Sequence, residues 1–398
     1  MACIKHHFGV KLFRSGLSQA SRKPYKAPIR KNFRYTMDDT FKPTDIKCLP
    51  GSFSSAWQSP SNIAIVKYWG KLPGQLPANP SLSLTLEKCH TETRLEMSRR
   101  DTAKEGFDVK IYFGGQEKPS FAPKIEKFFS RIEPYAPYLK DYCFTVRTDN
   151  TFPHSSGIAS SASGMSALAL CLTDFERTCG QTTAGQDFSR RASFYARLGS
   201  GSASRSIYGC AAVWGKTPAV ENSSDLYAVP VPYNSVHPVF RNMCDTVLLI
   251  ESGSKSVSST EGHALMDGHP FARQRFVQAG NNVEALAAIL REGDTEAFGH
   301  MAEAEALTLH AMMMTGEPYY ILFKPFTITA IQAIWAYRRD TGAQVYFTLD
   351  AGANVHILYP EAEKDKIRDF IENILVPSCG NCGFIHDNAG PGPGKLSD

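Results

Sequence analysis

The strongest constraint in this sequence is the segment 153–164, where a polar run of small residues passes directly into an apolar helical pattern. After Gly164, apolar residues recur at three- and four-residue spacing, which is typical of one face of an amphipathic helix. The first turn of such a helix leaves N–H groups without intrahelical partners, and its dipole is positive at that end. The segment therefore predicts an anion site. A serine-capped helix that simply enters a core is the alternative interpretation of this run taken alone.

Two further runs of the same chemical character occur at 199–206 and 252–262. The first of them carries Arg205, and its alternative interpretation is a flexible loop. The second follows a buried-looking strand and contains Lys255 and Ser259. An ordinary solvated lysine remains an open alternative for Lys255. Three such runs in one chain favour a shared role in binding anionic groups over three unrelated loops.

The length of 398 residues predicts two domains of ordinary size, and no window approaches 18 consecutive apolar residues, so no membrane span is expected. The ten cysteines lack a framework spacing, which indicates reduced thiols in a cytoplasmic protein. Only Cys379 and Cys382 have the spacing of metal ligands. They lack the second pair that a structural zinc site needs, so no protein-only metal site is expected.

The net charge of +4 depends on the first 36 residues, which hold nine Lys/Arg and no acid. The remainder has 43 − 9 = 34 basic against 39 acidic residues, so the body of the protein is mildly acidic. That balance argues against nucleic acid as a partner. The basic leader resembles a transit peptide or the product of an upstream start codon, and we expect disorder over 1–52.

The patterns along the chain predict an α+β protein of two lobes. The first lobe, 53–237, should contain one strand that ends near Lys67 and Lys71, further strands over 81–86, 91–97, 109–113, 142–147, 211–214 and 226–231, and helices over 123–132, 164–175 and 188–196. The second lobe, 238–388, should contain strands over 244–251, 345–349 and 355–359, and helices over 269–292, 295–315, 327–340 and 362–375. We expect a flexible tail over 389–398.

The chemistry-bearing residues suit phosphoryl transfer from ATP. Backbone N–H groups of the Ser/Gly runs would bind nucleotide phosphates, while Lys/Arg side chains and Mg²⁺ would neutralise charge. Asp350 follows a strand and precedes a glycine turn, where a carboxylate could accept a proton from an acceptor hydroxyl. Its alternative is an ordinary turn residue.

Four segments, 62–71, 157–164, 199–206 and 348–354, together resemble the signature segments of the diphosphomevalonate decarboxylases in the GHMP kinase superfamily. The similarity runs from about residue 57 to about residue 385 and follows the family's order. It implies a first lobe like domain 2 of ribosomal protein S5, a ferredoxin-like second lobe and an active site in the cleft between them. It also implies a homodimer in the cytoplasm that acts in isoprenoid biosynthesis.

The resemblance implies that ATP phosphorylates the tertiary C3 hydroxyl of mevalonate 5-diphosphate, after which phosphate and carbon dioxide leave to give isopentenyl diphosphate. By position, Asp350 would be the catalytic acid residue, Lys67 would assist it, and Arg205 would hold the substrate carboxylate. An alternative for Arg205 is a surface salt bridge. Further substrate contacts are expected from Tyr68, Lys71, Lys110, Ser200, Gly201 and Ser202. Contacts with ATP or Mg²⁺ are expected from Ser156, Gly157, Ala159, Ser160, Ser161, Ser163, Lys255 and Ser259.

Departures from the family pattern leave the substrate open. Lys110 stands where many members have Arg, the loop 72–77 lacks the usual charges, and Ala353 replaces the usual Pro. The alternatives are a decarboxylase of mevalonate 5-phosphate, or a GHMP kinase that does not decarboxylate. The presence of both Lys67 and Asp350 disfavours the kinase, and it also disfavours a catalytically silent binding protein. Nearby, His310 and the methionines 312–314 could line the cleft, with core packing as their alternative.

Overall fold

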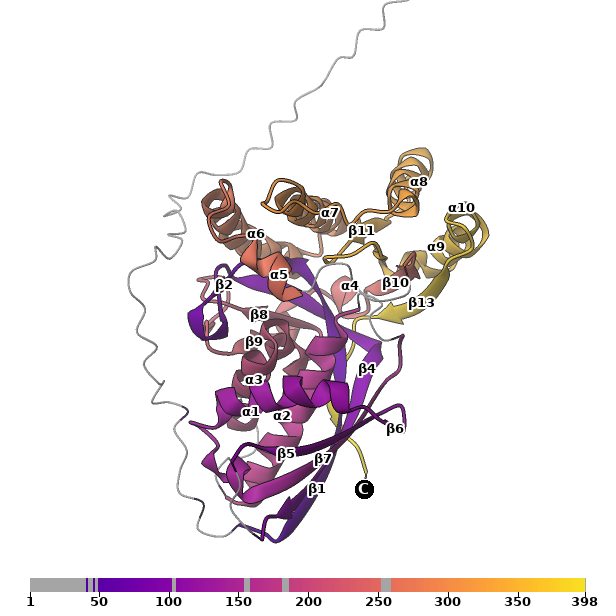
Figure 1. Ribbon diagram of the computed structural model, residues 1–398. Coiled ribbons are helices and arrows are strands. Elements are labelled where there is room, and N and C mark those ends of the chain that lie inside the picture. Colours follow the sequence, from indigo (N-terminus) through magenta and orange to yellow (C-terminus); the bar gives the residue numbers. More distant parts are fainter. Residues whose placement is uncertain are drawn as a thin grey trace, which may run out of the picture.

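The computed structural model describes residues 41, 46, 49–101, 105–153, 158–180, 186–251 and 259–397. These residues form two lobes, each of which combines a β-sheet with helices. Helices α1, α2 and α3 lie in one lobe, and α6, α7 and α8 lie in the other (Figure 1). Within the described ranges, no helix is long and apolar enough to cross a membrane. The eight cysteines among them are all free thiols.

The first lobe is built on an eight-stranded sheet with the order β14-β1-β4-β7-β5-β6, to which β8 and β9 are joined through β4. All of its pairings are antiparallel except that between β5 and β7. The strands are β1 (Ser52–Val66), β4 (Ser81–Arg99), β5 (Asp108–Phe113), β6 (Gln116–Glu117), β7 (Tyr142–Asn150), β8 (Ala211–Trp214), β9 (Ala228–Pro230) and β14 (Gly394–Lys395). A separate hairpin joins β2 (Lys71–Leu72) and β3 (Leu76–Pro77).

Strand β4 differs from the prediction of two strands over 81–86 and 91–97, because it is a single element of 19 residues. Its pairing with β1 shifts register between Pro60 and Asn62, and the residues opposite this shift need other partners for their N–H groups. The carboxylate of Asp387 accepts hydrogen bonds from three successive N–H groups there, those of residues 87–89, at 2.7–3.0 Å. A residue 300 positions away in the chain therefore completes this strand, which local sequence cannot indicate.

Three helices cover the first sheet: α1 (Ala122–Ile132), α2 (Ser160–Thr178) and α3 (Gln186–Gly199). Helix α1 buries Ile125, Phe128, Phe129 and Ile132, which lie on one face at three- and four-residue spacing. Helix α2 is buried along most of its length and lies between β1, β4 and α3. The predicted helices agree with these elements to within a few residues.

The second lobe has a four-stranded antiparallel sheet with the order β11-β12-β10-β13. Its strands are β10 (Cys244–Leu249), β11 (Tyr346–Thr348), β12 (Val355–Tyr359) and β13 (Gly383–Asn388). Its helices are α4 (Pro238–Arg241), α5 (Ser259–Ala264), α6 (Ala272–Glu292), α7 (Thr295–Met314), α8 (Pro325–Thr341), α9 (Lys364–Phe370) and α10 (Val376–Ser378), with a π-helical turn at Ile371–Leu375. The sequence predicted all of these except β13, α4, α5 and α10.

The expectation of a flexible tail over 389–398 is wrong for its described part. After β13 the chain returns to the first lobe, where β14 pairs with β1 through Trp57 and Lys395. Lys395 also forms an ion pair of 2.8 Å with the buried carboxylate of Asp174. The C-terminus accordingly lies beside β1, at the end of the first lobe that is remote from α6, α7 and α8 (Figure 1).

The end of the expected disordered leader over 1–52 is likewise packed onto the first lobe where the structure describes it. The ring of Phe41 stacks on Phe194 at 4.0 Å, and Arg191 donates a hydrogen bond of 2.6 Å to the Phe41 carbonyl. The hydroxyl of Tyr142 donates to the carbonyl of Pro50 at 2.6 Å. Aromatic burial and backbone hydrogen bonds thus fix these positions, which the basic composition of the leader did not indicate.

Candidate active site

Lys67 follows directly after β1 and is 2% exposed. Its Nζ donates to the Ala64 carbonyl at 2.5 Å and lies 3.2 Å from Oδ1 of Asp350. Burial lowers the pKa of Lys67, and the carboxylates of Asp350 and Glu305 oppose that shift. The arrangement is a cation removed from water beside a carboxylate from the other lobe.

Asp350 lies in the turn between β11 and β12 and keeps 30% of its side chain exposed. Its backbone carbonyl is 3.1 Å from Nε2 of His310, and since a carbonyl only accepts, that ring nitrogen is the donor. His310 itself is buried against Phe323, with ring centroids 4.1 Å apart, and burial lowers its pKa to about 4. A neutral histidine therefore holds the turn that presents the Asp350 carboxylate to Lys67. His310 therefore packs in the core, as one alternative had it, and also contacts the backbone of a residue of the candidate site.

Arg205 lies in a 3-10 helix at Gly201–Ile207, where the sequence left open a flexible loop. It is 2% exposed, so the alternative of a surface salt bridge is wrong. Its guanidinium donates to three neutral oxygens, from Ser81 (2.7 Å), Ser83 (3.0 Å) and Asn62 (3.3 Å). Burial lowers its pKa to about 10, and Asp350 and Tyr68 oppose that shift. Among the described residues, no carboxylate forms an ion pair with Arg205.

The segment around Arg205 packs closely on Tyr68. A Cβ at Gly201 would lie 2.6 Å from Trp214 and 3.0 Å from Tyr68, so only glycine fits there. The hydroxyl of Tyr68 is buried without a hydrogen-bond partner among the described residues, and burial raises its pKa. Ser200 and Ser202 are half-buried beside it. This wall of the site thus presents a hydroxyl that a bound ligand could satisfy.

Lys71 lies in β2, two residues beyond the aromatic pair 68–69, and is half-buried. Burial lowers its pKa, and the nearby charges of Arg131 and Lys127 on α1 lower it further. Three cations therefore lie near one another at this end of the site. Lys110, by contrast, is exposed on β5, and no described contact joins it to Lys67, Arg205 or Asp350. Its expected substrate contact stays a prediction.

The anion site predicted at 153–164 coincides with the start of α2 at Ser160. Its N-terminal cap is Ala159, a left-handed residue with φ of 47°, and no side chain caps the helix, contrary to the alternative of a serine cap. Ser160 and Ser161 are half-buried. Ser163 is fully buried and its hydroxyl is bonded to that of Thr91 at 2.6 Å, which joins α2 to β4, and its expected ATP contact stays a prediction.

Three predicted ATP contacts, Ser156, Gly157 and Lys255, lie outside the described residues. Ser259 begins α5. For these four positions the expected ATP contacts stay predictions.

Sequence reasoning missed the charged pair of Glu305 and Arg275, which lies directly behind Lys67. Glu305 is fully buried and accepts from Nη1 and Nη2 of Arg275 at 2.8 and 2.5 Å. The same carboxylate accepts from the backbone N–H of Lys67 at 2.9 Å and from Asn282 at 2.6 Å. This network fixes the backbone of the lysine that faces Asp350.

A signal for this pair was present in the sequence. Glu305 continues the buried positions Phe298, Ala302 and Leu309 of α7 at three- and four-residue spacing. A charged residue on such an apolar face is seldom buried unless it is paired.

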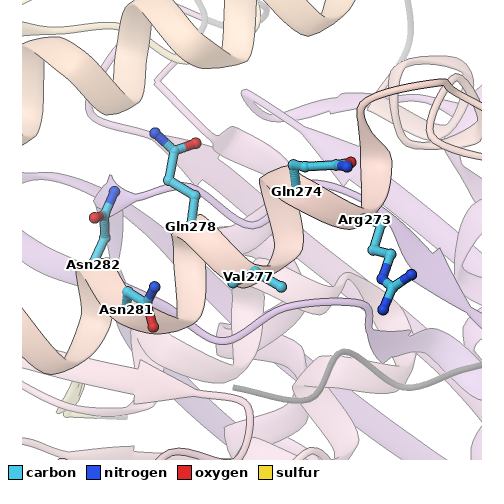
Figure 2. A pocket seen from close by; sticks show the side chains of 6 residues that line it. All are labelled: Arg273, Gln274, Val277, Gln278, Asn281 and Asn282. Atoms are coloured by element: carbon cyan, nitrogen blue, oxygen red, sulfur yellow. The ribbon is translucent and has the colours of Figure 1, made fainter. Parts of the chain in front are cut away.

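The open pocket on α6 is distinct from this site. Figure 2 shows its lining side chains following one another along the helix. They are Arg273, Gln274, Val277, Gln278, Asn281 and Asn282. The lining does not include Lys67, Arg205 or Asp350, but Asn282 reaches the Glu305 network from this side.

Comparison with known proteins identifies the family of this chain. A model of the diphosphomevalonate decarboxylase-like N-terminal domain matches residues 59–226, and one of the mevalonate 5-diphosphate decarboxylase C-terminal domain matches 246–389. The chain belongs to the diphosphomevalonate decarboxylase family. It is 29% identical over 342 residues to the diphosphomevalonate decarboxylase of Ganoderma lucidum, covering 81% of this chain and 82% of that one. It is also 27% identical over 341 residues to the phosphomevalonate decarboxylase of Haloferax volcanii, covering 84% and 94%.

Solved structures of this family confirm the two-lobed α+β fold of the GHMP kinases. Mevalonate diphosphate decarboxylase from Staphylococcus aureus superposes with a TM-score of 0.72 at 27% identity, covering 87% of this chain and 98% of that one. A complex described as MDDEF with MVAPP, AMPPCP and magnesium has the same TM-score at 26% identity and covers 87% and 100%. A structure of the mevalonate diphosphate decarboxylase from Enterococcus faecalis has a TM-score of 0.71 at 26% identity and covers 87% and 100%.

Proposed function

We propose that this protein catalyses the ATP-dependent decarboxylation of mevalonate 5-diphosphate to isopentenyl diphosphate. The observation that carries the proposal is the 3.2 Å pair of Lys67 Nζ and Asp350 Oδ1, contributed by the two lobes. The carboxylate is partly open to solvent while the cation is buried, so the reactive group of the pair is the accessible one. Arg205, buried beside them without a carboxylate partner among the described residues, suits the carboxylate of the substrate.

In the first step, the Asp350 carboxylate accepts the proton of the C3 hydroxyl as that oxygen attacks the γ-phosphorus of ATP and ADP leaves. Lys67 stabilises the negative charge near the transferred phosphoryl group. In the second step, the C3–O bond breaks and phosphate leaves with its electron pair. The electrons of the carbon–carboxylate bond then form the double bond at C3, and carbon dioxide departs. Arg205 orients that carboxylate until the bond breaks.

The residues present suit ATP and Mg²⁺. The start of α2, where the N-terminal cap Ala159 supplies no side-chain cap, and the half-buried residues Ser160 and Ser161 offer a helix N-terminus and hydroxyl groups that suit nucleotide phosphates and a hard cation. The magnesium ion supplies charge neutralisation on the phosphates when it is bound. Lys71, with Arg131 and Lys127 near it, suits the phosphorylated end of the substrate.

A decarboxylase of mevalonate 5-phosphate is the second candidate. The Haloferax volcanii relative with that name is nearly as similar to this chain as the diphosphate enzymes are. Lys110 lies exposed on β5, and its position gives no support for binding the second phosphate of the diphosphate substrate near Lys71. A kinase that stops before decarboxylation is disfavoured because Lys67 and Asp350 are paired.

The test is an assay of purified protein with ATP, Mg²⁺ and either 5-phospho- or 5-diphosphomevalonate, in which ADP and carbon dioxide are followed together. Equal release of both from the diphosphate is the expected result. Preference for the monophosphate would establish the second candidate. Release of ADP without carbon dioxide would show that the protein is a kinase and would overturn both.

The proposal includes a homodimer in the cytoplasm, as the family resemblance implies. Large apolar side chains are exposed around the start of α8 and suit an interface between copies: Tyr319 (76%), Ile321 (72%), Phe326 (43%) and Ile328 (39%). Light scattering of the purified protein measures the mass directly, and a monomer at micromolar concentration would contradict this part of the proposal.

A further inference from the structure

His263, on α5, lies against the loop that follows β1, and no expected role in the reaction accounts for it. The backbone N–H of Gly70 donates to its Nδ1 at 3.1 Å. Its ring lies 4.2 Å from that of Tyr68 and 4.9 Å from that of Trp69. A Cβ at Gly262 would lie 2.5 Å from Trp69, so α5 approaches this loop as closely as glycine allows. The ring is therefore fixed against the lysine loop on two sides.

The contact with Gly70 determines which proton the ring carries. Because Nδ1 accepts a hydrogen bond, the proton of the neutral imidazole is on Nε2. Burial, and after it the charges of Lys71 and Arg205, lower the pKa of His263 to about 3, so the ring is neutral at ordinary pH. Among the described residues, Nε2 has no hydrogen-bond partner.

A neutral N–H donor near cations attracts an acceptor that carries negative charge. The charges of Lys71 and Arg205 both act on His263, and those of Arg131 and Lys127 act on Lys71. Three cations near one another suit a group with more than one negative charge. The donor is thus on the side of the site that fits a phosphate, whereas Arg205 is on the side that fits a carboxylate.

We propose that His263 is a substrate-binding residue whose Nε2–H donates a hydrogen bond to the phosphorylated end of the substrate. This inference rests on the proposed function for the identity of that substrate. The contact with Gly70 sets the direction of the donor, so binding of the substrate also fixes the loop that carries Lys67 and Lys71.

Two substitutions separate the two ring nitrogens. His263→Asn retains an acceptor near Nδ1 for Gly70 and loses the donor at Nε2, whereas His263→Gln retains a donor near Nε2. For His263→Asn, the KM of the phosphorylated mevalonate should rise on the order of 10- to 100-fold, the loss expected for one hydrogen bond to a charged group. The KM of ATP and the melting temperature should not change. His263→Gln should recover part of the substrate affinity.

Binding of inorganic pyrophosphate, measured by calorimetry on the same three proteins, separates this inference from the proposed function. If the unsubstituted enzyme turns over neither phosphorylated mevalonate, the proposed function fails and the pyrophosphate affinities alone decide the role of His263. Weaker binding by His263→Asn than by His263→Gln supports the proposal. Equal affinity of all three proteins, or an equal loss in both variants, would overturn it.

Discussion

Arg205 and Arg275 are both almost completely buried, yet the fold treats their charges differently. The guanidinium of Arg275 forms a two-point ion pair with Glu305, and the same carboxylate holds the backbone of Lys67. Within the described part of the chain, the guanidinium of Arg205 donates only to neutral oxygens, and its pKa falls to about 10 as a result of burial. The charge of Arg275 is therefore paired directly with a carboxylate, whereas Arg205 forms no ion pair among the described residues, although the charge of Asp350 acts on it.

This difference suggests separate roles for the two arginines: Arg275 supports the fold, and Arg205 is suited to binding a ligand. A buried cation without a counter-charge raises the free energy of the folded protein, and an anionic ligand that pairs with it recovers that energy as affinity. Lys67 lies between the two cases, because the fold supplies Asp350 but leaves that carboxylate partly accessible. The stability of the fold should thus depend on Arg275 and Glu305, and substrate binding on Arg205.

The largest effect should come from Asp350→Asn, which removes the accessible carboxylate. Turnover should fall about 10²–10⁴-fold, the usual contribution of general-base assistance. The side chain keeps its size, and His310 still binds the backbone carbonyl at that position, so ATP affinity should be retained. Single-turnover kinetics with calorimetry of ATP binding measure both quantities, and near-normal turnover would refute the proposed mechanism.

Arg275→Met should lower the free energy of unfolding by about 3–5 kcal/mol, because it leaves the Glu305 carboxylate buried and unpaired. Urea denaturation measures this loss. The control is Arg339→Met, since Arg339 forms an exposed pair with Asp340 that should contribute no more than about 1 kcal/mol. Equal losses in the two variants would show that the Glu305 pair has no special role.

Arg205→Met is the matched test, because the same substitution at this position should affect substrate binding strongly and stability only weakly. Removal of a buried charge without a carboxylate partner should cost less than half the stability lost in Arg275→Met. The KM of the phosphorylated mevalonate should rise about 10²-fold, as for a buried charge that loses its partner. Parallel denaturation and steady-state assays test both, and a loss of stability as large as that of Arg275→Met would break the distinction.

The smallest effect should come from Ser81→Ala, which removes the shortest hydrogen bond that Arg205 donates. Ser83 and Asn62 remain as acceptors, so the free energy of unfolding should fall by about 1 kcal/mol. Turnover should be nearly unchanged. A collapse of substrate affinity in this variant would mean that neutral hydrogen bonds, and not the charge, determine how Arg205 binds.

The sequence indicated the three candidate residues that the structure brings near one another, but not the residues that hold them in place. Lys67, Arg205 and Asp350 lie within short segments whose residue types indicate their chemistry, and α2 begins within its serine run because small residues allow the turn there. Glu305 and Arg275 were missed although each is a charged residue on an apolar helix face. Their pairing joins two helices, and no local pattern indicates which charges meet.

The remaining differences have the same cause. A single strand over Ser81–Arg99 depends on the carboxylate of Asp387, and the pairing of the tail depends on β1, more than 300 residues earlier. Composition rich in glycine and proline indicated disorder in that tail, but these residues allow the close approach of its backbone to Gly209. In both regions, contacts between segments far apart in the sequence determine the structure, and local sequence propensity does not indicate such contacts.

The return of the chain to β1 has a consequence for the order in which the protein can fold. During synthesis, the first 243 residues emerge before any strand of the second sheet, yet β14 and the Asp387 carboxylate come from beyond residue 386. The sheet of the first lobe therefore cannot be completed until the second lobe has been synthesised. A ribosome paused between the lobes would carry β1 without its β14 partner at Trp57 and Gln58, and an unpaired strand edge is prone to pairing with other chains.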